Sequence, residues 1–518
     1  MRQIKIFIYL TLAVALLGSC KREFLTLYPE GNLNEGNFYK STTDFQQAVN
    51  GAYAPLRDIA NNAYYMDEMR SDNAQYDYNQ KDRGNAATEN LIDFLDEANN
   101  AITFNRYQAD YNGISRTNVI LDRLTAITFT MADADKNQIV GEAKALRAHY
   151  YFDLVRTYGG VPIPLHETKT SSDAFLARST AEQVYAQVIT DFTDALGLLA
   201  APTFAAAQTG RVTKGMVATE LGTVYLQRKE YDKAIPLFQS VTQMGYTLMP
   251  NFRDVFNPAN KNTSKELIFD VQFQSGTTGQ SSNFIYRFTP ITGNTTNILG
   301  VNFNNTIGGW DVPTDDLISQ FEPGDTRLDA SIGIVEGTLD ANTNFVPTRV
   351  VSAVNYTTPA GVLAKRFPRK YYYPPYPALN QNTDQNWPLY RYSDVLLMLA
   401  ECLNETGKSA QALPYLNQVR TRAFGAGNGQ ITVTDQVALR AIIAKERRTE
   451  LAFENKRWQD LIRTGQAIPV MTAYGTKLKQ QFGYLLPQSY NVTQNRLLYP
   501  IPLREINLNP LLVQNPGY

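Results

Sequence analysis

Histidine and cysteine are almost missing from this sequence, which has two of each among 518 residues. Because histidine is the usual general base and a common metal ligand, its scarcity limits both kinds of chemistry. His149 lies among tyrosines in Arg147–Leu154 and is predicted to pack in the scaffold, and His166 has no second histidine near it. The sequence therefore predicts no metal site and no cofactor.

Recognised catalytic motifs are missing as well. The sequence has no H-E-x-x-H, no G-x-S-x-G, no P-loop and no paired C-x-x-C. The acid-rich stretch Asp311–Asp316 lacks the ligand alternation of a calcium-binding loop, so a capped turn is expected there. Paired carboxylates of a glycoside hydrolase have no sequence signature, which leaves that activity open as an alternative.

An excess of charge of one sign is also missing, since 48 basic residues face 49 acidic ones and the net charge is −1. This balance disfavours nucleic acid or an anionic membrane surface as a partner. A long apolar run occurs only at Ile6–Leu17, after Arg2 and Lys5. It is shorter than the roughly 18 residues that span a bilayer and is typical of a signal peptide.

The signal peptide ends in Leu17–Cys20, "LGSC", which resembles the signal of bacterial lipoproteins. In those proteins the peptide is cut before the cysteine, and the cysteine carries lipid. We predict that residues 1–19 are removed, that Cys20 is lipidated and that residues 20–41 form a membrane tether. An ordinary signal peptide with an incidental Cys20 is the alternative. A lipidated Cys20 would leave Cys402 as the sole thiol, so no intrachain disulfide could form.

Helical repeats dominate what is present. The stretch Met216–Tyr246 matches the tetratricopeptide repeat, a pair of packed helices, with Gly222 and Phe238 among the matching positions. A second, gapless copy includes Leu399 and Leu416. Small residues at such positions allow the two helices to approach closely, and large ones fill the groove between them.

The composition divides the rest of the chain. Apolar residues at three-to-four spacing predict further helices over residues 44–57, 117–125, 135–158, 180–199 and 437–464. Between residues 274 and 386 the sequence is rich in Gly, Asn, Thr and Pro and shows no sustained helical spacing of apolar residues. We predict a mainly α fold in which residues 42–518 form one intertwined unit. Its parts are a tetratricopeptide-like helical scaffold (42–270 and 391–470), a large loop-rich, partly β insert for ligand or partner (271–390) and a C-terminal strap (471–518).

Four segments, residues 22–56, 141–165, 446–465 and 497–518, resemble the SusD/RagB-like outer-membrane lipoproteins in sequence and in order. The third segment reads "ERRTELAFENKRWQDLIRTG". The resemblance implies a tetratricopeptide-like fold and a lipid-anchored position at the cell surface. It also implies a SusC-like TonB-dependent barrel as partner, and capture of glycans without catalysis.

Three functions remain open on the sequence. The leading one is a non-catalytic glycan-binding lipoprotein that delivers its ligand to the SusC-like transporter. A second is an assembly protein whose helix pairs bind a peptide, as tetratricopeptide grooves do. A third, less favoured, is a glycoside hydrolase on the same surface.

A sugar presents C–H faces to aromatic rings and hydroxyls to amides, carboxylates and guanidinium groups. Ligand-binding candidates are therefore aromatic and polar residues in polar loops: Asn73, Tyr76, Tyr78, Arg83, Tyr286, Trp310 and Trp387. Trp310 is the first choice, because Gly308 and Gly309 precede it and no apolar stripe surrounds it. A ring that closes the edge of the core is the alternative for each aromatic, and Lys370–Pro377 could instead meet the partner barrel.

The remaining motif residues are predicted to belong to the scaffold. Trp458 lies among the apolar residues of a helix and is expected in the core. The charged residues of Glu446–Glu450 are expected to form a partly buried ion-pair network.

Overall fold

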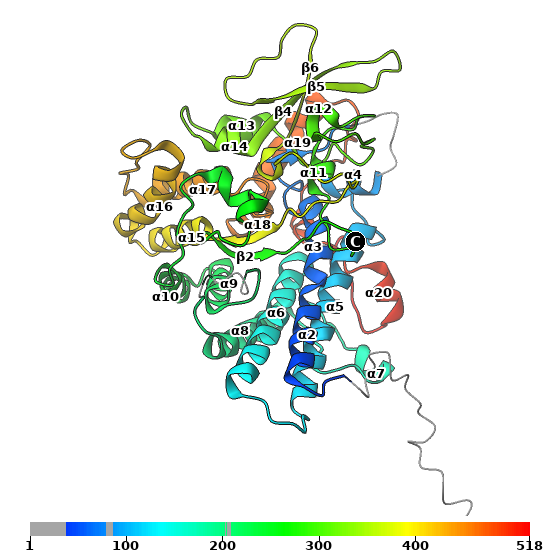
Figure 1. Ribbon diagram of the computed structural model, residues 1–518, viewed down its shortest axis with the longest axis vertical. Coiled ribbons are helices and arrows are strands. Elements are labelled where there is room, and N and C mark those ends of the chain that lie inside the picture. The colour runs from blue at the N-terminus through cyan, green and yellow to red at the C-terminus, as the bar shows by residue number, and fades with distance from the viewer. Residues whose placement is uncertain (1–37, 79–85, 203, 205–208) are drawn as a thin grey trace, which may run out of the picture.

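The computed structural model describes residues 38–78, 86–202, 204 and 209–518 of the chain (Figure 1). Its first half is helical except for the short strand β1 (Ala74–Gln75). The helices of this half are α2 (Thr42–Tyr53), α3 (Pro55–Met66), α4 (Ala86–Ile92), α5 (Ala101–Leu124), α6 (Asp133–Tyr158), α7 (Ser171–Ala174), α8 (Ala181–Leu198), α9 (Lys214–Gln227) and α10 (Tyr231–Thr242).

Side-chain caps fix where several of these helices begin. Ser41 and Asp44 form a reciprocal capping box at the start of α2, with Ser41 N–H donating to Asp44 at 2.9 Å. Thr180 and Gln183 form the same motif at α8, at the start of the helix predicted over residues 180–199. Each box satisfies backbone N–H groups that the first turn of a helix leaves without partners.

The predicted helix pairs are confirmed. Helix α9 packs on α10, and the second pair consists of α15 (Tyr392–Glu405) and α16 (Ser409–Phe424). Gly222 faces the ring of Phe238, and a Cβ at this glycine would lie 2.6 Å from that ring. The close approach of the two helices therefore requires glycine here. Helix α15 also packs on α10, so the two pairs form one continuous helical layer.

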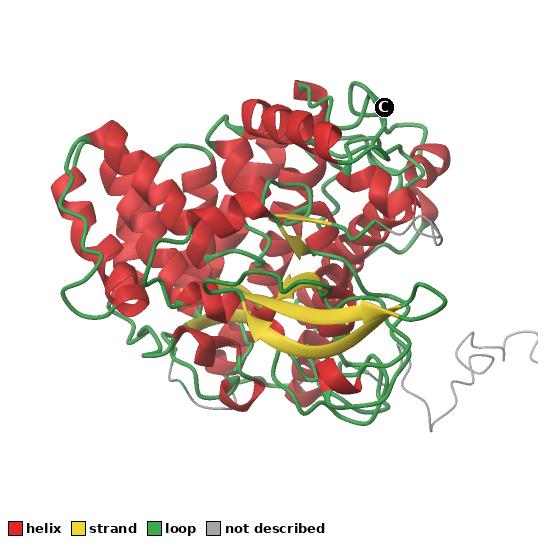
Figure 2. Cartoon of the chain, turned by 90° about the horizontal axis from the view of Figure 1, so that it is seen from above, coloured by secondary structure: helices red, strands yellow, loops and turns green. Residues whose placement is uncertain are grey.

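The insert contains short elements joined by long loops, and its strands are the yellow arrows of Figure 2. All pairing is antiparallel: β5–β4–β6 form a three-stranded sheet, while β1–β3 and β2–β7 form two-stranded ribbons. The elements of the insert and of the segment that leads into it are η3 (Phe252–Phe256), η4 (Pro258–Asn260), β2 (Leu267–Val271), α11 (Phe284–Phe288), α12 (Thr296–Leu299), β3 (Val312–Pro313), α13 (Asp315–Gln320), α14 (Arg327–Ser331), β4 (Ile332–Leu339), β5 (Phe345–Ser352), β6 (Leu363–Pro368), η5 (Arg369–Tyr371) and β7 (Trp387–Arg391).

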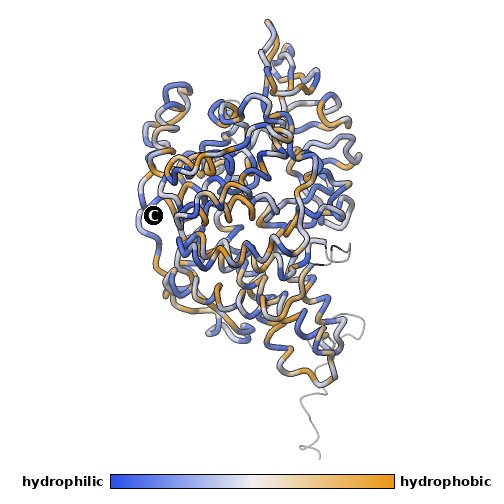
Figure 3. Tube along the Cα trace, turned by 90° about the vertical axis from the view of Figure 1, so that its left-hand side faces the viewer, coloured by the Kyte–Doolittle hydropathy of each residue, from blue (hydrophilic) through white to orange (hydrophobic). Residues whose placement is uncertain are grey.

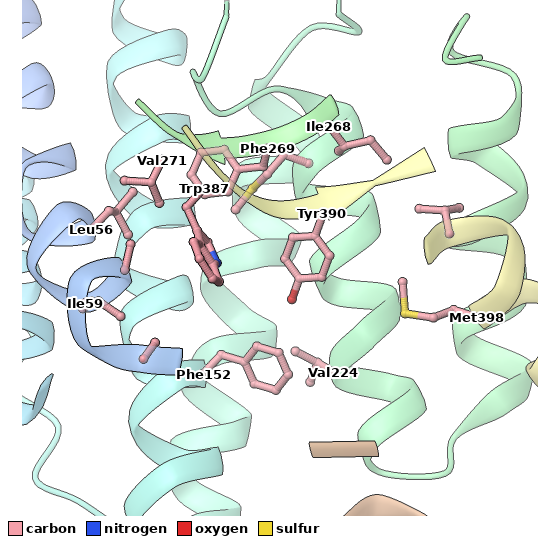
Figure 4. Close-up of a cluster of buried hydrophobic side chains, with 14 of the residues drawn as sticks. Leu56, Ile59, Phe152, Val224, Ile268, Phe269, Val271, Trp387, Tyr390 and Met398 are labelled. Carbon is pink, nitrogen blue, oxygen red and sulfur yellow. The ribbon is translucent and has the colours of Figure 1, made fainter. Parts of the chain in front are cut away.

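The β2–β7 ribbon joins the insert to the helical layer. Figure 4 shows Phe269 and Trp387 of this ribbon together with Phe152 of α6 and Met398 of α15. These side chains belong to one large buried cluster that extends through the scaffold. The mainly α scaffold with a partly β insert that the sequence predicts is therefore what the structure contains.

Buried ion pairs tie this ribbon to the C-terminal helices. Arg391, at the end of β7, is fully buried and contacts Glu266 at 2.6 Å, Glu450 at 3.0 Å and Glu454 at 2.7 Å. Glu450 also accepts from Arg422 at 2.5 Å. Its pKa lies far below the usual range, because these cations outweigh the effect of burial. The network predicted for Glu446–Glu450 is thus confirmed.

The C-terminal region begins with three more helices, α17 (Gln436–Glu450), α18 (Arg457–Arg463) and α19 (Ala467–Gln481). Trp458 of α18 is 1% exposed, as predicted. Helix α19 extends into the segment 471–518, which we predicted to be a C-terminal strap. Beyond it, η6 (Gln494–Leu497) and α20 (Leu503–Leu508) interrupt a strap that returns to the first half, where Tyr499 N–H donates to Thr157 O at 2.9 Å.

Membrane-spanning character is missing from the helices that the structure describes, none of which combines the length and the apolar composition of a bilayer span. Figure 3 shows hydrophobic and hydrophilic residues interleaved along the described chain. This mixture is typical of helices that bury one face and expose the other.

Candidate functional site

The segment from Ser71 to Tyr78 carries three of the predicted ligand residues, Asn73, Tyr76 and Tyr78, and is bonded to the scaffold. Arg457 binds the carboxylate of Asp72 at 2.7 Å, and Thr314 donates its hydroxyl to the Asp72 carbonyl at 2.8 Å. Asn73 is 1% exposed; it donates to Glu68 at 2.9 Å and accepts from Arg448 at 2.8 Å. We predicted a ligand contact for Asn73, but both ends of its amide are used inside the scaffold.

A chain of aromatic rings leads from the core to the surface beside this segment. Trp310 meets Tyr65 edge-on, with ring centroids 5.3 Å apart, and Tyr76 at 6.1 Å. Tyr76 lies 6.0 Å from Tyr484, which stacks on Tyr78 at 3.8 Å with an interplanar angle of 6°. We call these five residues the aromatic ladder. It brings together three predicted residues, Tyr76, Tyr78 and Trp310.

Only the outer end of the aromatic ladder reaches solvent. Tyr78 and Tyr484 are half-buried, whereas Tyr76 is 5% exposed and donates its hydroxyl to Asp93 at 2.9 Å. Burial, and then the charge of Asp93, raise the pKa of the Tyr76 phenol, so this group remains a hydrogen-bond donor. Tyr76 therefore supports the outer rings from behind.

Trp310 takes a different place from the exposed one we expected. The two preceding glycines do form a sharp turn, with Gly309 at φ +82° and its N–H bonded to Thr289 O at 2.9 Å. The turn points the indole inward, where it is 7% exposed and packs against Tyr65. A buried face cannot stack on a sugar, so the ring belongs to the core edge in this structure.

Trp387 and Tyr286 are also buried, contrary to the exposure we expected. Trp387 is 1% exposed and lies parallel to Tyr371, 5.0 Å between centroids, with Phe284 at the same distance. Tyr286 is 0% exposed and belongs to a satellite cluster with Phe345. Their polar sequence neighbours concealed contacts with aromatic residues from distant parts of the chain. Arg83 and Cys20 lie outside the described residues.

A recess of about 800 Å³ opens beside Tyr78, at the end of the molecule formed by the insert. Three parts of the chain line it: residues 291–297 with Asn304, the β4–β5 hairpin over residues 339–347, and Asp77 and Tyr78 with Lys365 of β6. This volume is within the range of about 300–1,000 Å³ that ligand pockets have in proteins. The recess is therefore our candidate site.

Hydrogen bonds within the lining hold the loops around the recess. Asn294 accepts from Thr296 N–H at 2.7 Å at the start of α12, and Asn297 donates to Pro347 O at 3.0 Å. The carboxylate of Asp340 accepts from the backbone N–H groups of Asn342 and Asn344, both at 2.8 Å. The hairpin turn and the start of α12 are thus fixed by hydrogen bonds among exposed polar groups.

Other polar groups remain available to a ligand. The amide of Asn304 is exposed and forms no hydrogen bond within the part of the chain that the structure describes. The Thr296 hydroxyl is exposed nearby, while Leu339 and Val346 add apolar surface, 53% and 42% exposed. An amide and a hydroxyl beside apolar and aromatic surface match the two sides of a sugar ring.

One ion pair lies at the floor of the recess. The ammonium group of Lys365 contacts the carboxylate of Asp77, and it also lies 5.3 Å from the ring centroid of Phe345. Asp77 is held in place by its N–H, which donates to Gly309 O at 2.7 Å. A Cβ at Gly309 would lie 3.1 Å from that of Asp77, so the turn before Trp310 also positions this carboxylate.

The interior of the protein contains a second, much smaller cavity. It measures about 80 Å³ and is lined by ion-paired side chains such as Asp153 and Arg156 and by the predicted residue Trp387. A water molecule needs roughly 10–15 Å³ of such space, so the cavity has room for a few water molecules but not for a sugar. His149, at its edge, bonds Glu220 at 2.7 Å and is a packed scaffold residue, as predicted.

The acidic stretch Asp311–Asp316 forms the predicted capped turn. Thr314 caps α13, and its hydroxyl accepts from Leu317 N–H at 3.1 Å. Across the described ranges, no group of three or more His, Cys, Asp and Glu side chains is arranged to hold a metal ion.

Several residues of the site were missed on the sequence. Tyr484 follows α19 in a segment that we interpreted only as a strap, and Asn304 and Lys365 stand in the insert outside the stretches that supplied the candidate residues. The density of asparagine and threonine between residues 291 and 306 was the available signal, since those side chains line the recess.

Two family descriptions match the chain over most of its length: "SusD family" over residues 265–518 and "Starch-binding associating with outer membrane" over residues 23–226. The chain belongs to the SusD family. A SusD-like protein of Formosa agariphila is 26% identical over 96% of this chain and 97% of its own length.

Solved structures of the SusD family share the fold. A SusD homologue from Bacteroides thetaiotaomicron superposes with a TM-score of 0.75 at 22% identity, covering 95% of this chain and 100% of that one. A structure described as a laminarin-binding SusD-like protein has a TM-score of 0.72 at 25% identity, covering 93% and 100%. The mainly α scaffold with its insert is thus the SusD fold.

Proposed function

We propose that this SusD-family protein is a non-catalytic glycan-binding lipoprotein of the outer-membrane surface, which delivers its ligand to a SusC-like TonB-dependent transporter. The observation that carries the proposal is the recess beside Tyr78, where exposed amide and hydroxyl groups stand next to aromatic and apolar surface. Family membership supports it, because one matching family description is of starch-binding proteins associated with the outer membrane.

In this proposal, Tyr78 is the stacking surface and Tyr484 its support. The parallel stack at 3.8 Å holds the Tyr78 ring in one orientation before any ligand binds. A preordered ring loses little conformational freedom on binding, which favours affinity. Asn304 and Thr296 would bind sugar hydroxyls from the opposite side of the recess.

The test is titration of the purified protein, without residues 1–20, against a panel of polysaccharides by calorimetry. Replacing Asn304 by Ala should weaken binding about fivefold, because a hydrogen bond of this kind contributes about 1 kcal/mol. Asn137→Ala is the matched control, since Asn137 is an exposed asparagine on α6. If no polysaccharide binds, or if Asn304→Ala binds like the control, the glycan site is refuted. Release of shorter oligosaccharides during incubation would refute the non-catalytic assignment.

The membrane anchor has a separate test. Lipid on Cys20 follows from the lipoprotein-like "LGSC" sequence. Cys20→Ala should move the protein from the membrane fraction to the soluble fraction of the expressing cells, because no acyl chain can be attached. A variant that stays in the membrane fraction after removal of the signal peptide would contradict the anchor. Co-purification with an outer-membrane barrel encoded beside the gene would test the partner.

A further inference from the structure

An acid without a partner is buried in the turn that positions Asp77. Asp311 is 0% exposed, and neither oxygen of its carboxyl group has a hydrogen-bond partner among the described residues. An ionised carboxylate in this place would lose its hydration with no donor to replace it, whereas a neutral carboxyl group loses much less. We therefore expect Asp311 to carry a proton in the folded protein.

A second buried acid, Glu68, acts on Asp311. Glu68 is 0% exposed and accepts a hydrogen bond from the Asn73 amide at 2.9 Å. It also accepts from the backbone N–H groups of Phe453 at 2.8 Å and Asn455 at 3.1 Å. Burial raises the pKa of both acids, and the charge of Glu68 raises the pKa of Asp311 further. Because the three donors favour the ionised form of Glu68, the proton of this acid pair belongs to Asp311.

The other titratable groups around the acid pair come from α3, α11, η5 and α18: Tyr64, Tyr65, Arg287, Lys370, Tyr371 and Arg457. Burial raises the pKa of the three tyrosines, so they stay neutral. Arg287 bonds the Tyr65 hydroxyl. Lys370 bonds Glu454 at 2.6 Å, and Arg457 bonds Asp72 at 2.7 Å. Each cation thus has an acceptor of its own, and the charge that acts on Asp311 is that of Glu68.

The turn that carries Asp311 also holds the floor of the recess. Gly309 O accepts from Asp77 N–H at 2.7 Å, and Asp77 directly precedes Tyr78. After Asp311 the chain continues as β3, which pairs with β1 shortly before Asp77. Asp311 itself has φ +58°, a conformation that aspartate and asparagine tolerate better than most residues. A change at this acid therefore reaches two residues of the recess through main-chain bonds.

From these contacts we infer that the recess is pH-sensitive: a protonated Asp311 keeps the turn closed and holds Asp77 and Tyr78 in place, and its ionisation opens the turn and weakens ligand binding. In the open turn the carboxyl group reaches water and releases its proton above about pH 4. The closed turn keeps the proton, so opening becomes more favourable as the pH rises, by up to about tenfold per pH unit. The part that concerns the ligand rests on the proposed function, whereas the opening of the turn does not.

The first measurement is hydrogen–deuterium exchange of residues 71–78 at about pH 5, 6 and 7, corrected for the effect of pH on exchange itself. These values stay below about 8, the value to which burial lowers the pKa of Lys370. Asp311→Asn removes the ionisation, keeps the shape of the side chain and suits the positive φ. Asp58→Asn is the matched control, since Asp58 is an exposed aspartate of α3.

Exchange of residues 71–78 should increase by up to about tenfold per pH unit in the unmodified protein and in the control. It should change much less with pH in Asp311→Asn. Asp311→Gly, which also removes the ionisation and suits the positive φ, should behave in the same way and replaces Asp311→Asn if that variant does not fold. Asp270 and the other buried acids are present in all of these proteins, so their titration cancels in the comparison.

The second measurement is the affinity at the same pH values for laminarin, soluble starch and any other polysaccharide that the panel identifies as a ligand. Between pH 5 and pH 7 the unmodified protein and the control should lose at least about twofold in affinity, because only the closed fraction binds. Asp311→Asn should keep its affinity over this range.

The alternative results separate the two proposals. Exchange that depends on pH equally in the unmodified protein and in the Asp311 variants would overturn the role of Asp311. If exchange differs as expected but affinity does not depend on pH, the coupling of the turn to the recess is overturned and the glycan-binding function stands. Binding of none of the polysaccharides would overturn the proposed function, and exchange would still decide whether Asp311 controls the turn.

Discussion

The helical scaffold and the loop-rich insert use charged residues in opposite ways. In the scaffold, charges are buried and shared, as where Arg391 contacts three glutamates inside the protein. At the recess of the insert, charges form single, partly exposed pairs such as Asp77–Lys365, beside neutral groups such as Asn304. In the proposed function, the loops that line the recess gain rigidity from their contacts with the helical scaffold.

The strongest test of this contrast removes a buried cation from the frame. Arg391→Met should lower the free energy of unfolding by about 4 kcal/mol, or prevent folding, because three glutamates lose their shared partner. Arg440→Met is the control, since Arg440 forms an exposed pair with Glu405 on the same group of helices. Denaturant unfolding measures the free energy of unfolding of both variants. If the two variants lower it equally, the contrast between buried and exposed charge pairs is contradicted.

The next test concerns a residue at the border of the two regions. Trp310→Ala should lower the free energy of unfolding by about 3 kcal/mol, because it leaves a cavity beside Tyr65. Trp310→Phe, which keeps an aromatic ring, should cost clearly less. A Trp310→Ala protein of unchanged stability that has lost glycan affinity would instead make this ring the sugar platform.

The third test measures how stability depends on pH at the β2–β7 ribbon, which joins the two regions. Burial raises the pKa of Asp270 on β2 to about 6, against 3.8 for the free side chain. Between these values the folded protein binds more protons than the unfolded one, so stability falls as the pH rises through this window. Relative to Asp270→Asn, the unmodified protein should lose about 2 kcal/mol between pH 4 and pH 6.5. If the difference in unfolding free energy between the unmodified protein and Asp270→Asn stays constant with pH, the raised pKa of Asp270 is contradicted.

The smallest effect is expected at the outer end of the aromatic ladder. Tyr78→Ala should weaken glycan binding about fivefold, roughly 1 kcal/mol, with little change in unfolding, because this half-buried ring lines the recess. Tyr415→Ala, a half-buried tyrosine of α16, is the control and should leave affinity unchanged. In a double-mutant cycle, Tyr78 and Tyr484 should couple, and additive effects would speak against the stack.

The sequence predicted the frame well because the frame depends on local pattern. The cap at Thr180, the pairing of Gly222 with Phe238 and the core position of Trp458 all follow from residues a few positions apart. Helix α19, which ends at Gln481, was not predicted beyond residue 470, because residues 471–518 were assigned to a strap.

The candidate site was predicted only in part, because its geometry depends on contacts between distant segments. Tyr76 and Tyr78 were placed near the site, but nothing beside Trp310 in sequence indicates that Tyr65 covers it. Likewise, Trp387 stands among polar residues in sequence and among aromatic rings in space. Side-chain type alone does not show which face of a loop turns inward.

The bonds that hold the Ser71–Tyr78 segment have a consequence for protein engineering. They come from Arg448, Arg457 and Thr314, which do not line the recess. Positions such as Asn304 and Thr296 can therefore be randomised in a display library while the segment beneath keeps its place. Under the proposed function, the chain is a template from which variants that bind other sugars can be selected.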